Sequence, residues 1–132
     1  MINFHEIKVG DIILAEYEGV RNEGEVTELN HEDKEVCVDN SVQEFWYTPD
    51  QLFGIPLDDS QLVKFHFEKQ DEGANGNKYL KGPFRIHLPQ KDNFSSIEIW
   101  YREDRRHLNH PVSVHELQNH YFAMTKVHLT RE

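Results

Sequence analysis

The 132 residues are enough for one domain with a substantial core, or for two very small lobes that share one. The chain carries 24 acidic and 14 basic residues, and its net charge of −10 lies entirely in residues 1–57, which hold 13 acids and three bases. A surface this acidic repels phosphate, so this half is a poor candidate for binding DNA or RNA. Two interpretations fit the charge: a basic macromolecular partner, or a solvated acidic surface with no partner.

The sequence predicts neither membrane insertion nor export. Its longest apolar runs, such as residues 12–15, are far too short to span a bilayer, and the N-terminus has no charged-then-apolar signal pattern. We therefore expect a cytoplasmic protein. The single Cys37 cannot form an internal disulfide, and its place in an alternating stretch favours a small buried side chain over a nucleophile.

Residues 1–57 alternate in the manner of a small antiparallel β-barrel. Strands are expected at residues 12–17, 23–29, 35–39 and 44–47, a spacing of about ten residues. Thr48 and Pro49 predict one short helical turn, followed by a last strand at residues 53–57. With its Val-Gly-Asp lead-in at residues 9–11, this order resembles SH3-like barrels, which implies an acidic SH3-like domain.

Residues 58–132 change period and predict an α+β lobe packed on the barrel. We expect a helix at 58–67, a polar loop at 71–77, and strands at about 78–88 and 96–102. Residues 102–107 read as a charged turn, residues 114–125 as a helix, and residues 126–130 as an edge strand or a frayed end. The fold class is therefore α+β, a barrel followed by a helix-strand-strand-helix lobe.

The predicted C-terminal helix contains His-Glu-Leu-Gln-Asn-His, which looks at first like the metal-binding motif of zinc proteases. That motif needs two histidines four residues apart on one helix face, whereas His115 and His120 are five apart. Their rings would lie about 140° apart around the helix and could not share one zinc ion. Ser113 and Glu116 instead form a capping box, which predicts a helix that starts near Val114.

Three stretches carry a family resemblance: residues 54–67, the central strands, and residues 114–125, which read Val-His-Glu-Leu-Gln-Asn-His-Tyr-Phe-Ala-Met-Thr. Together they resemble small proteins without assigned activity that are widespread in Bacteroidota genomes and their phages. The chain departs from that pattern where His120 replaces an apolar residue and where no Gly-Glu-Glu-Leu follows Thr125. The resemblance implies the architecture and a mobile-element context, and it implies no activity.

Histidine is unusually frequent, with nine residues in the chain and five of them in the last 26. His107, His110 and His115 are the candidate metal ligands, since neutral imidazoles suit Zn²⁺, Ni²⁺ or Cu²⁺. There is no second cysteine and no ordered ligand spacing, so scattered histidines that titrate near neutral pH are the alternative. We expect no cofactor, and a histidine-ligated metal enzyme is the third hypothesis for the function.

The polar face of the two central strands is a candidate ligand site. If the strands pair, a tryptophan lies among basic side chains, a surface that can stack a base and bind an anion. The predicted residues are Arg85, His87, Trp100, Arg102, Arg105 and Arg106. They support the second hypothesis, a small-ligand protein that binds or sequesters nucleotides, although the helices could instead cover this face and bury Trp100.

No nucleophile with its base, no phosphate-binding loop and no carboxylate pair with an evident pocket can be read, so we expect no enzymatic activity. The first hypothesis is an interaction protein, associated with a phage or mobile element, whose acidic barrel binds a basic protein surface. That surface could belong to a nucleic-acid-binding defence enzyme that the protein inhibits. The predicted partner-binding residues are Glu16, Glu18, Glu23, Glu25, Glu28, Glu44 and Trp46. No direct contact with nucleic acid or membrane is expected.

Overall fold

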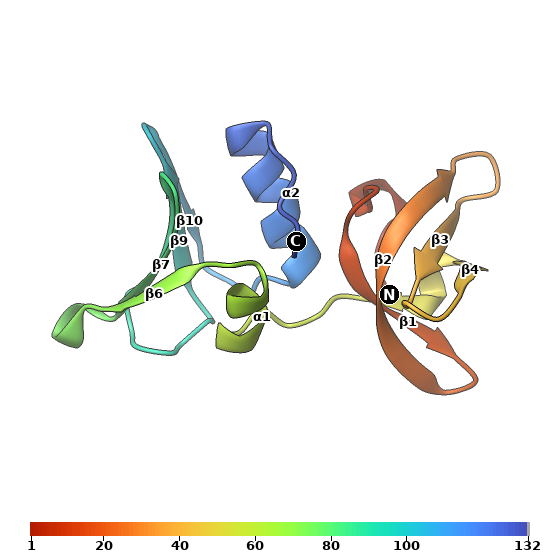
Figure 1. Ribbon diagram of the computed structural model, residues 1–132, viewed down its shortest axis with the longest axis horizontal. Helices are drawn as coiled ribbons and strands as arrows, with labels where there is room; N and C mark the ends of the chain where they lie inside the picture. Colours follow the sequence, from red (N-terminus) through yellow and green to blue (C-terminus); the bar gives the residue numbers. More distant parts are fainter. Residues whose placement is uncertain (132) are drawn as a thin grey trace. The chain divides into compact units, whose positions relative to one another are not determined.

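The computed structural model describes residues 1–131 and divides the chain into two compact units (Figure 1). The first unit comprises Met1–Ile55 and Ser113–Asn119, and the second comprises Pro56–Val112 and the residues from His120 onward. Each unit contains one five-stranded antiparallel sheet, and residues 1–131 include two α-helices. The predicted α+β class is confirmed. No helix among the described residues has the length and apolar character needed to cross a bilayer.

The first unit is built on a sheet with the strand order β4-β3-β2-β1-β5. Its elements are the 3-10 helix η1 (Phe4–Glu6), β1 (Ile12–Tyr17), β2 (Val20–Asn30), β3 (Glu35–Asp39), β4 (Glu44–Tyr47), the 3-10 helix η2 (Pro49–Gln51) and β5 (Leu52–Phe53). The strands predicted at 12–17, 35–39 and 44–47 are confirmed, while the last strand is only two residues long. Within residues 1–131 no ladder joins β4 to β5, so this sheet does not close into a hydrogen-bonded barrel.

Alternation explains the core of the first unit, because each strand turns one set of side chains inward. Ile13, Val26, Val36 and Leu52 are fully buried. Gly24 is needed for the close approach of β2 and β3, since a Cβ atom there would lie 2.5 Å from Val38 Cγ1. The β2–β3 register then shifts between Val26 and Glu28, which marks a bulge.

The second unit contains a meander in which each strand pairs with the next, in the order β10-β9-β8-β7-β6. Its elements are α1 (Asp59–Lys64), β6 (Glu68–Asp71), the 3-10 helix η3 (Gly73–Asn75), β7 (Asn77–Lys81), β8 (Phe84–Leu88), β9 (Ile97–Tyr101) and β10 (Asp104–Leu108). Tyr79, Phe84, Ile86 and Ile99 are fully buried on one face of this sheet. α1 and the part of α2 (Val114–Thr125) that begins at His120 lie against that face (Figure 1), where the ring of Phe84 lies 4.7 Å from that of Tyr121.

Several expectations for the second unit were wrong. The helix expected at 58–67 ends at Lys64, because His66 adopts a left-handed backbone conformation with φ of 68°. The strand expected at 78–88 is a hairpin that turns at Gly82, where φ is 57°. The charged turn expected at 102–107 contains β10. Two alternatives were open for residues 126–130, and of these the edge strand is not formed. In β10, pairing with β9 prevails over a composition that has no apolar alternation.

The helix expected at 114–125 is confirmed as α2 (Val114–Thr125). Glu116 accepts a hydrogen bond from the backbone N–H of Ser113 at 3.0 Å, which is one half of the predicted capping box. The Ser113 hydroxyl donates to the same carboxylate at 2.7 Å. Val114 and Leu117, three residues apart on one face of this helix, are fully buried.

Candidate functional site

Three carboxylates form a row across one face of the first sheet. Glu25 on β2 lies directly opposite Asp39 on β3, and Asp39 lies directly opposite Glu44 on β4. Like charges in directly opposite positions destabilise a sheet. None of the ion pairs within residues 1–131 includes any of the three, so the chain does not neutralise this carboxylate row.

The carboxylate row is oriented by neighbouring hydrogen bonds. Asp39 accepts from the backbone N–H of Ser41 at 2.8 Å. Glu44 Oε2 lies 3.4 Å from both Thr27 Oγ1 and Cys37 Sγ. Burial raises the pKa of the Cys37 thiol, which therefore stays protonated and acts as a donor to Glu44. These bonds fix the oxygens of two of the three carboxylates.

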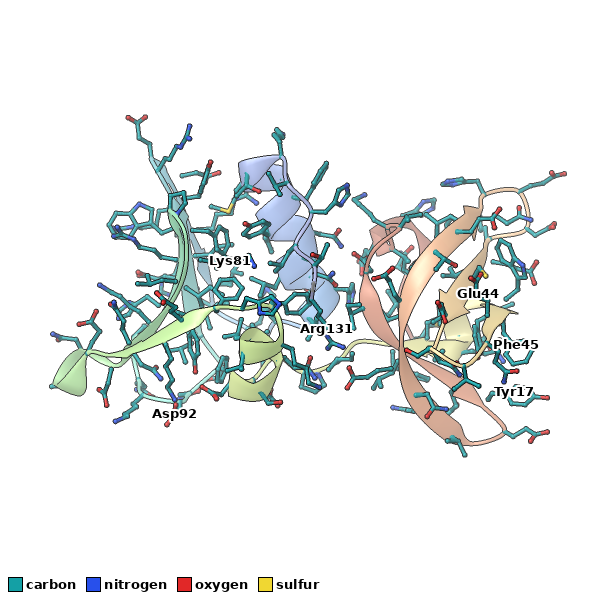
Figure 2. The ribbon with its side chains drawn as sticks, viewed as in Figure 1. Tyr17, Glu44, Phe45, Lys81, Asp92 and Arg131 are labelled. Carbon is teal, nitrogen blue, oxygen red and sulfur yellow. The ribbon has the colours of Figure 1, made fainter. Side chains whose placement is uncertain are left out.

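Exposed aromatic side chains on β4 flank the carboxylate row. Trp46 lies opposite Cys37, two residues from Glu44 and on the same face, with 44% of its surface exposed. Phe45 points to the other face, where its ring stacks on that of Tyr17 at a centroid distance of 6.1 Å (Figure 2). Tyr17 and Phe45 are 57% and 43% exposed. The first unit thus exposes aromatic surface on both sides of one edge strand.

Two of the predicted partner-binding residues lie apart from the carboxylate row. Glu16 forms an ion pair with Arg21 at 3.1 Å, and the Arg21 guanidinium lies 3.7 Å from the centre of the Phe53 ring. The negative charge of Glu16 is therefore neutralised by Arg21. Glu18 lies in the β1–β2 turn with a left-handed backbone, φ of 51°.

Other predicted partner-binding residues belong with the row. Glu28 lies opposite Cys37, on the face that carries Trp46, and Glu23 lies two residues before Glu25 on the same strand. Asp39 was missed from the sequence. Its position two residues after Cys37 in an alternating strand was the signal that could have placed it on this face.

The second sheet carries a tryptophan between two arginines on the face opposite its buried side chains. Arg85 on β8 and Arg105 on β10 both lie directly opposite Trp100 on β9. The guanidinium carbon of Arg105 lies 4.0 Å from the centre of the indole ring, and that of Arg85 lies 5.4 Å from it. The indole N–H donates to the Arg102 carbonyl at 2.7 Å, which fixes the ring. We call this group the Arg–Trp–Arg row.

Three predicted ligand residues lie outside the Arg–Trp–Arg row: His87, which lies opposite Glu98, and Arg102 and Arg106. Arg102 lies in the β9–β10 turn with φ of 56°, and its guanidinium carbon lies 5.1 Å from the Tyr101 ring. Arg106 lies opposite the fully buried Ile99, on the covered face, where its Nη1 lies 3.0 Å from His120 Nδ1. Strand alternation separates Arg106 from Arg105, so the prediction that both share the site was wrong.

On the same face of the second sheet, a carboxylate between two imidazoles lies beside the Arg–Trp–Arg row. His87 and His107 lie on either side of Glu98, with Nδ1 to carboxylate distances of 3.8 and 3.3 Å. His87 Nε2 also donates to the Asn75 carbonyl at 2.8 Å. A groove of about 500 Å³ follows this face, and Trp100, Arg105 and the neighbouring η3 segment are among the residues that line it.

The three candidate metal ligands are not brought together. His107 faces Glu98, His110 Nδ1 contacts the Pro111 carbonyl at 3.1 Å, and His115 is buried at the start of α2. Within residues 1–131, no group of three or more histidine, cysteine, aspartate or glutamate side chains is arranged to hold a metal ion. Burial lowers the pKa of His115, which favours its neutral form.

A buried polar cluster joins the start of α2 to the segment before β1. The side chain of Gln118 accepts from the Ile12 N–H at 2.7 Å and donates to the Gly10 carbonyl at 2.9 Å. Asp11 accepts from the Lys8 N–H at 2.9 Å and from the Asn119 amide at 3.4 Å. Asp11 is only 3% exposed, and burial raises its pKa to about 6. The cluster has a structural role, because its polar groups bond one another.

Comparison of the chain with protein-family models, with curated proteins and with solved structures finds no match in any of the three.

Proposed function

We propose that the protein is a non-enzymatic interaction protein whose carboxylate row and Trp46 bind a basic surface of another protein. One observation carries the proposal: Glu25, Asp39 and Glu44 face one another across three strands beside an exposed tryptophan, and none of them forms an ion pair within residues 1–131. Repulsion within the row destabilises the unbound sheet. A partner's lysine and arginine side chains would relieve that repulsion.

The aromatic side chains supply the second part of an interface. Tryptophan and tyrosine are enriched among residues that dominate binding energies, while opposite charges around them speed association and select the partner. Trp46 would provide the apolar contact beside the row, and the net charge of −10 in residues 1–57 would attract a basic partner from a distance.

A nucleic-acid-binding groove is the partner surface we propose, because such a groove must be strongly basic to hold phosphates. The resemblance to phage-associated proteins supports a defence enzyme of the host cytoplasm as its owner, with the protein as its inhibitor. The order β4-β3-β2-β1-β5, with a 3-10 turn before β5, supports an SH3-like assignment for the first unit.

A partner capture with matched variants tests the proposal. The row variant carries Glu25→Gln, Asp39→Asn and Glu44→Gln, which keep an acceptor oxygen at each position. The control variant carries Glu32→Gln, Glu68→Gln and Glu103→Gln, which remove the same charge from exposed positions elsewhere. Wild-type and control proteins should capture the same basic protein from host lysate at low salt, and the row variant should lose it. Equal capture by all three proteins would contradict the proposal.

A further inference from the structure

We propose that Arg85 and Arg105 form a binding site for the phosphate group of a small phosphorylated sugar, mononucleotides included. The site lies on the second sheet, and it is independent of the carboxylate row. It revises the ligand surface expected from the sequence, because it excludes Arg102 and Arg106 and rests on the Arg–Trp–Arg row.

Two guanidinium groups lie within cation–π distance of one indole ring, that of Trp100. Both arginines lie directly opposite Trp100 in the β-ladders, and the hydrogen bond from the indole N–H to the Arg102 carbonyl holds the ring between them. A guanidinium that stacks through its flat face keeps its N–H groups, which lie in its plane, available for bonding. Two such groups can bind phosphate oxygens through paired N–H donors.

The charges on this face leave these two arginines uncommitted. Lys78 is paired with Glu72 at 3.2 Å, and Glu98 faces the two histidines. Within residues 1–131, neither Arg85 nor Arg105 belongs to an ion pair with a carboxylate. Two positive charges without a counter-ion, one on each side of the Trp100 ring, favour the binding of an anion at the exposed edge of that ring.

The groove beside the Arg–Trp–Arg row indicates which class of ligand the site takes. Trp100 and Arg105 line this groove, and Arg85 lies next to it, on the other side of Trp100. The groove's volume of about 500 Å³ falls within the range of small-molecule sites. Glu72 and Glu98 also line it, and their carboxylates repel further phosphates but accept hydrogen bonds from hydroxyl groups. One phosphate with neighbouring hydroxyls satisfies both sets of groups, as in a sugar phosphate.

A nucleic acid fits this face less well. Residues 58–132 contain 11 acidic and 11 basic side chains, so the second half of the chain has no net charge with which to attract a polyanion. The two glutamates of the groove would also oppose the next phosphate of a strand. The occupant we infer is therefore a small molecule.

Calorimetric titration of the full-length protein tests the site. The probes are ribose 5-phosphate and AMP, with ribose and adenosine as matched ligands without phosphate, and a single-stranded oligonucleotide as the polyanion. At millimolar concentration the protein should bind ribose 5-phosphate and AMP, and it should bind neither ribose nor adenosine. Failure to bind either phosphorylated probe, equal binding of ribose and adenosine, or tighter binding of the oligonucleotide would overturn the inference.

Variants assign the binding to the two guanidiniums. Arg85→Gln and Arg105→Gln should each weaken AMP binding at least tenfold, because each removes charge-assisted hydrogen bonds. Arg102→Gln is the matched control, since it removes the same charge from the adjoining turn. All three side chains are exposed, so the variants should fold, which circular dichroism would verify. Unchanged affinity in the first two variants, or an equal loss in the control, would overturn the assignment.

Discussion

The substitution Asp11→Asn should change the pH dependence of the stability of the first unit. Asp11 is buried, and its carboxylate accepts hydrogen bonds from the Lys8 N–H and the Asn119 amide. Burial outweighs these bonds and raises its pKa from 3.8 to about 6. An asparagine of nearly the same shape keeps one acceptor oxygen and cannot ionise.

The direction in which the free energy of unfolding changes with pH follows from proton linkage. Between about pH 4 and 6, folded Asp11 holds a proton that the unfolded chain has released, so the free energy of unfolding falls as the pH rises. The shift of about two pKa units corresponds to about 3 kcal/mol across this window. The Asp11→Asn variant has no carboxyl group at this position, so its free energy of unfolding does not fall for this reason as the pH rises. Relative to wild type, its free energy of unfolding should therefore rise by about 3 kcal/mol between pH 4 and 7.

Urea unfolding followed by the indole N–H resonance of Trp46 measures this quantity in the first unit. The pKa of buried His115 is lowered, so its contribution is lost as the pH falls below its unfolded value, with the opposite slope. That contribution is common to both proteins and cancels in their difference. A difference between variant and wild type that stays constant from pH 4 to 7 would refute the reasoning.

Two further substitutions probe the second unit. Gly76→Ala should lower the free energy of unfolding by about 3 kcal/mol or more, because φ is 89° there and a Cβ atom would meet the Leu88 carbonyl oxygen. Gly82→Ala is the control, since φ is 57° there and a Cβ atom would meet no other atom. In the same urea titration it should lower the free energy of unfolding by about 1 kcal/mol. Equal losses would contradict this. Tyr79→Phe removes a 2.6 Å hydrogen bond to the half-exposed Asp59 and should cost about 1 kcal/mol; no loss would show that water replaces the hydroxyl fully.

Strands with one buried face were predictable from the sequence. Residues 12–17, 35–39 and 44–47 alternate, and their inward positions, such as Ile13 and Val36, are buried as the pattern requires. The start of α2 was predictable for a similar local reason, the pair Ser113 and Glu116. β10 was not, because Asp104–Leu108 has little apolar content and forms a strand through its pairing with β9.

The site residues needed information that only the register provides. Glu25 and Glu44 could be read as exposed acids, but their alignment with Asp39 depends on two ladders, a bulge and the length of the β3–β4 loop. Arg105 and Arg106 were expected to act together because residues 102–107 read as a turn. Once those residues form a strand, alternation sends the two side chains to opposite faces.

The central claim is that the carboxylate row binds a basic protein, and the salt dependence of that binding tests it most directly. The affinity of the captured partner for wild type, the row variant and the control variant would be measured from low to high salt. The claim predicts that wild-type affinity falls steeply with salt, that the control follows it, and that the row variant binds weakly with a shallow dependence. Wild-type affinity that does not change with salt, or a row variant that follows wild type, would contradict it.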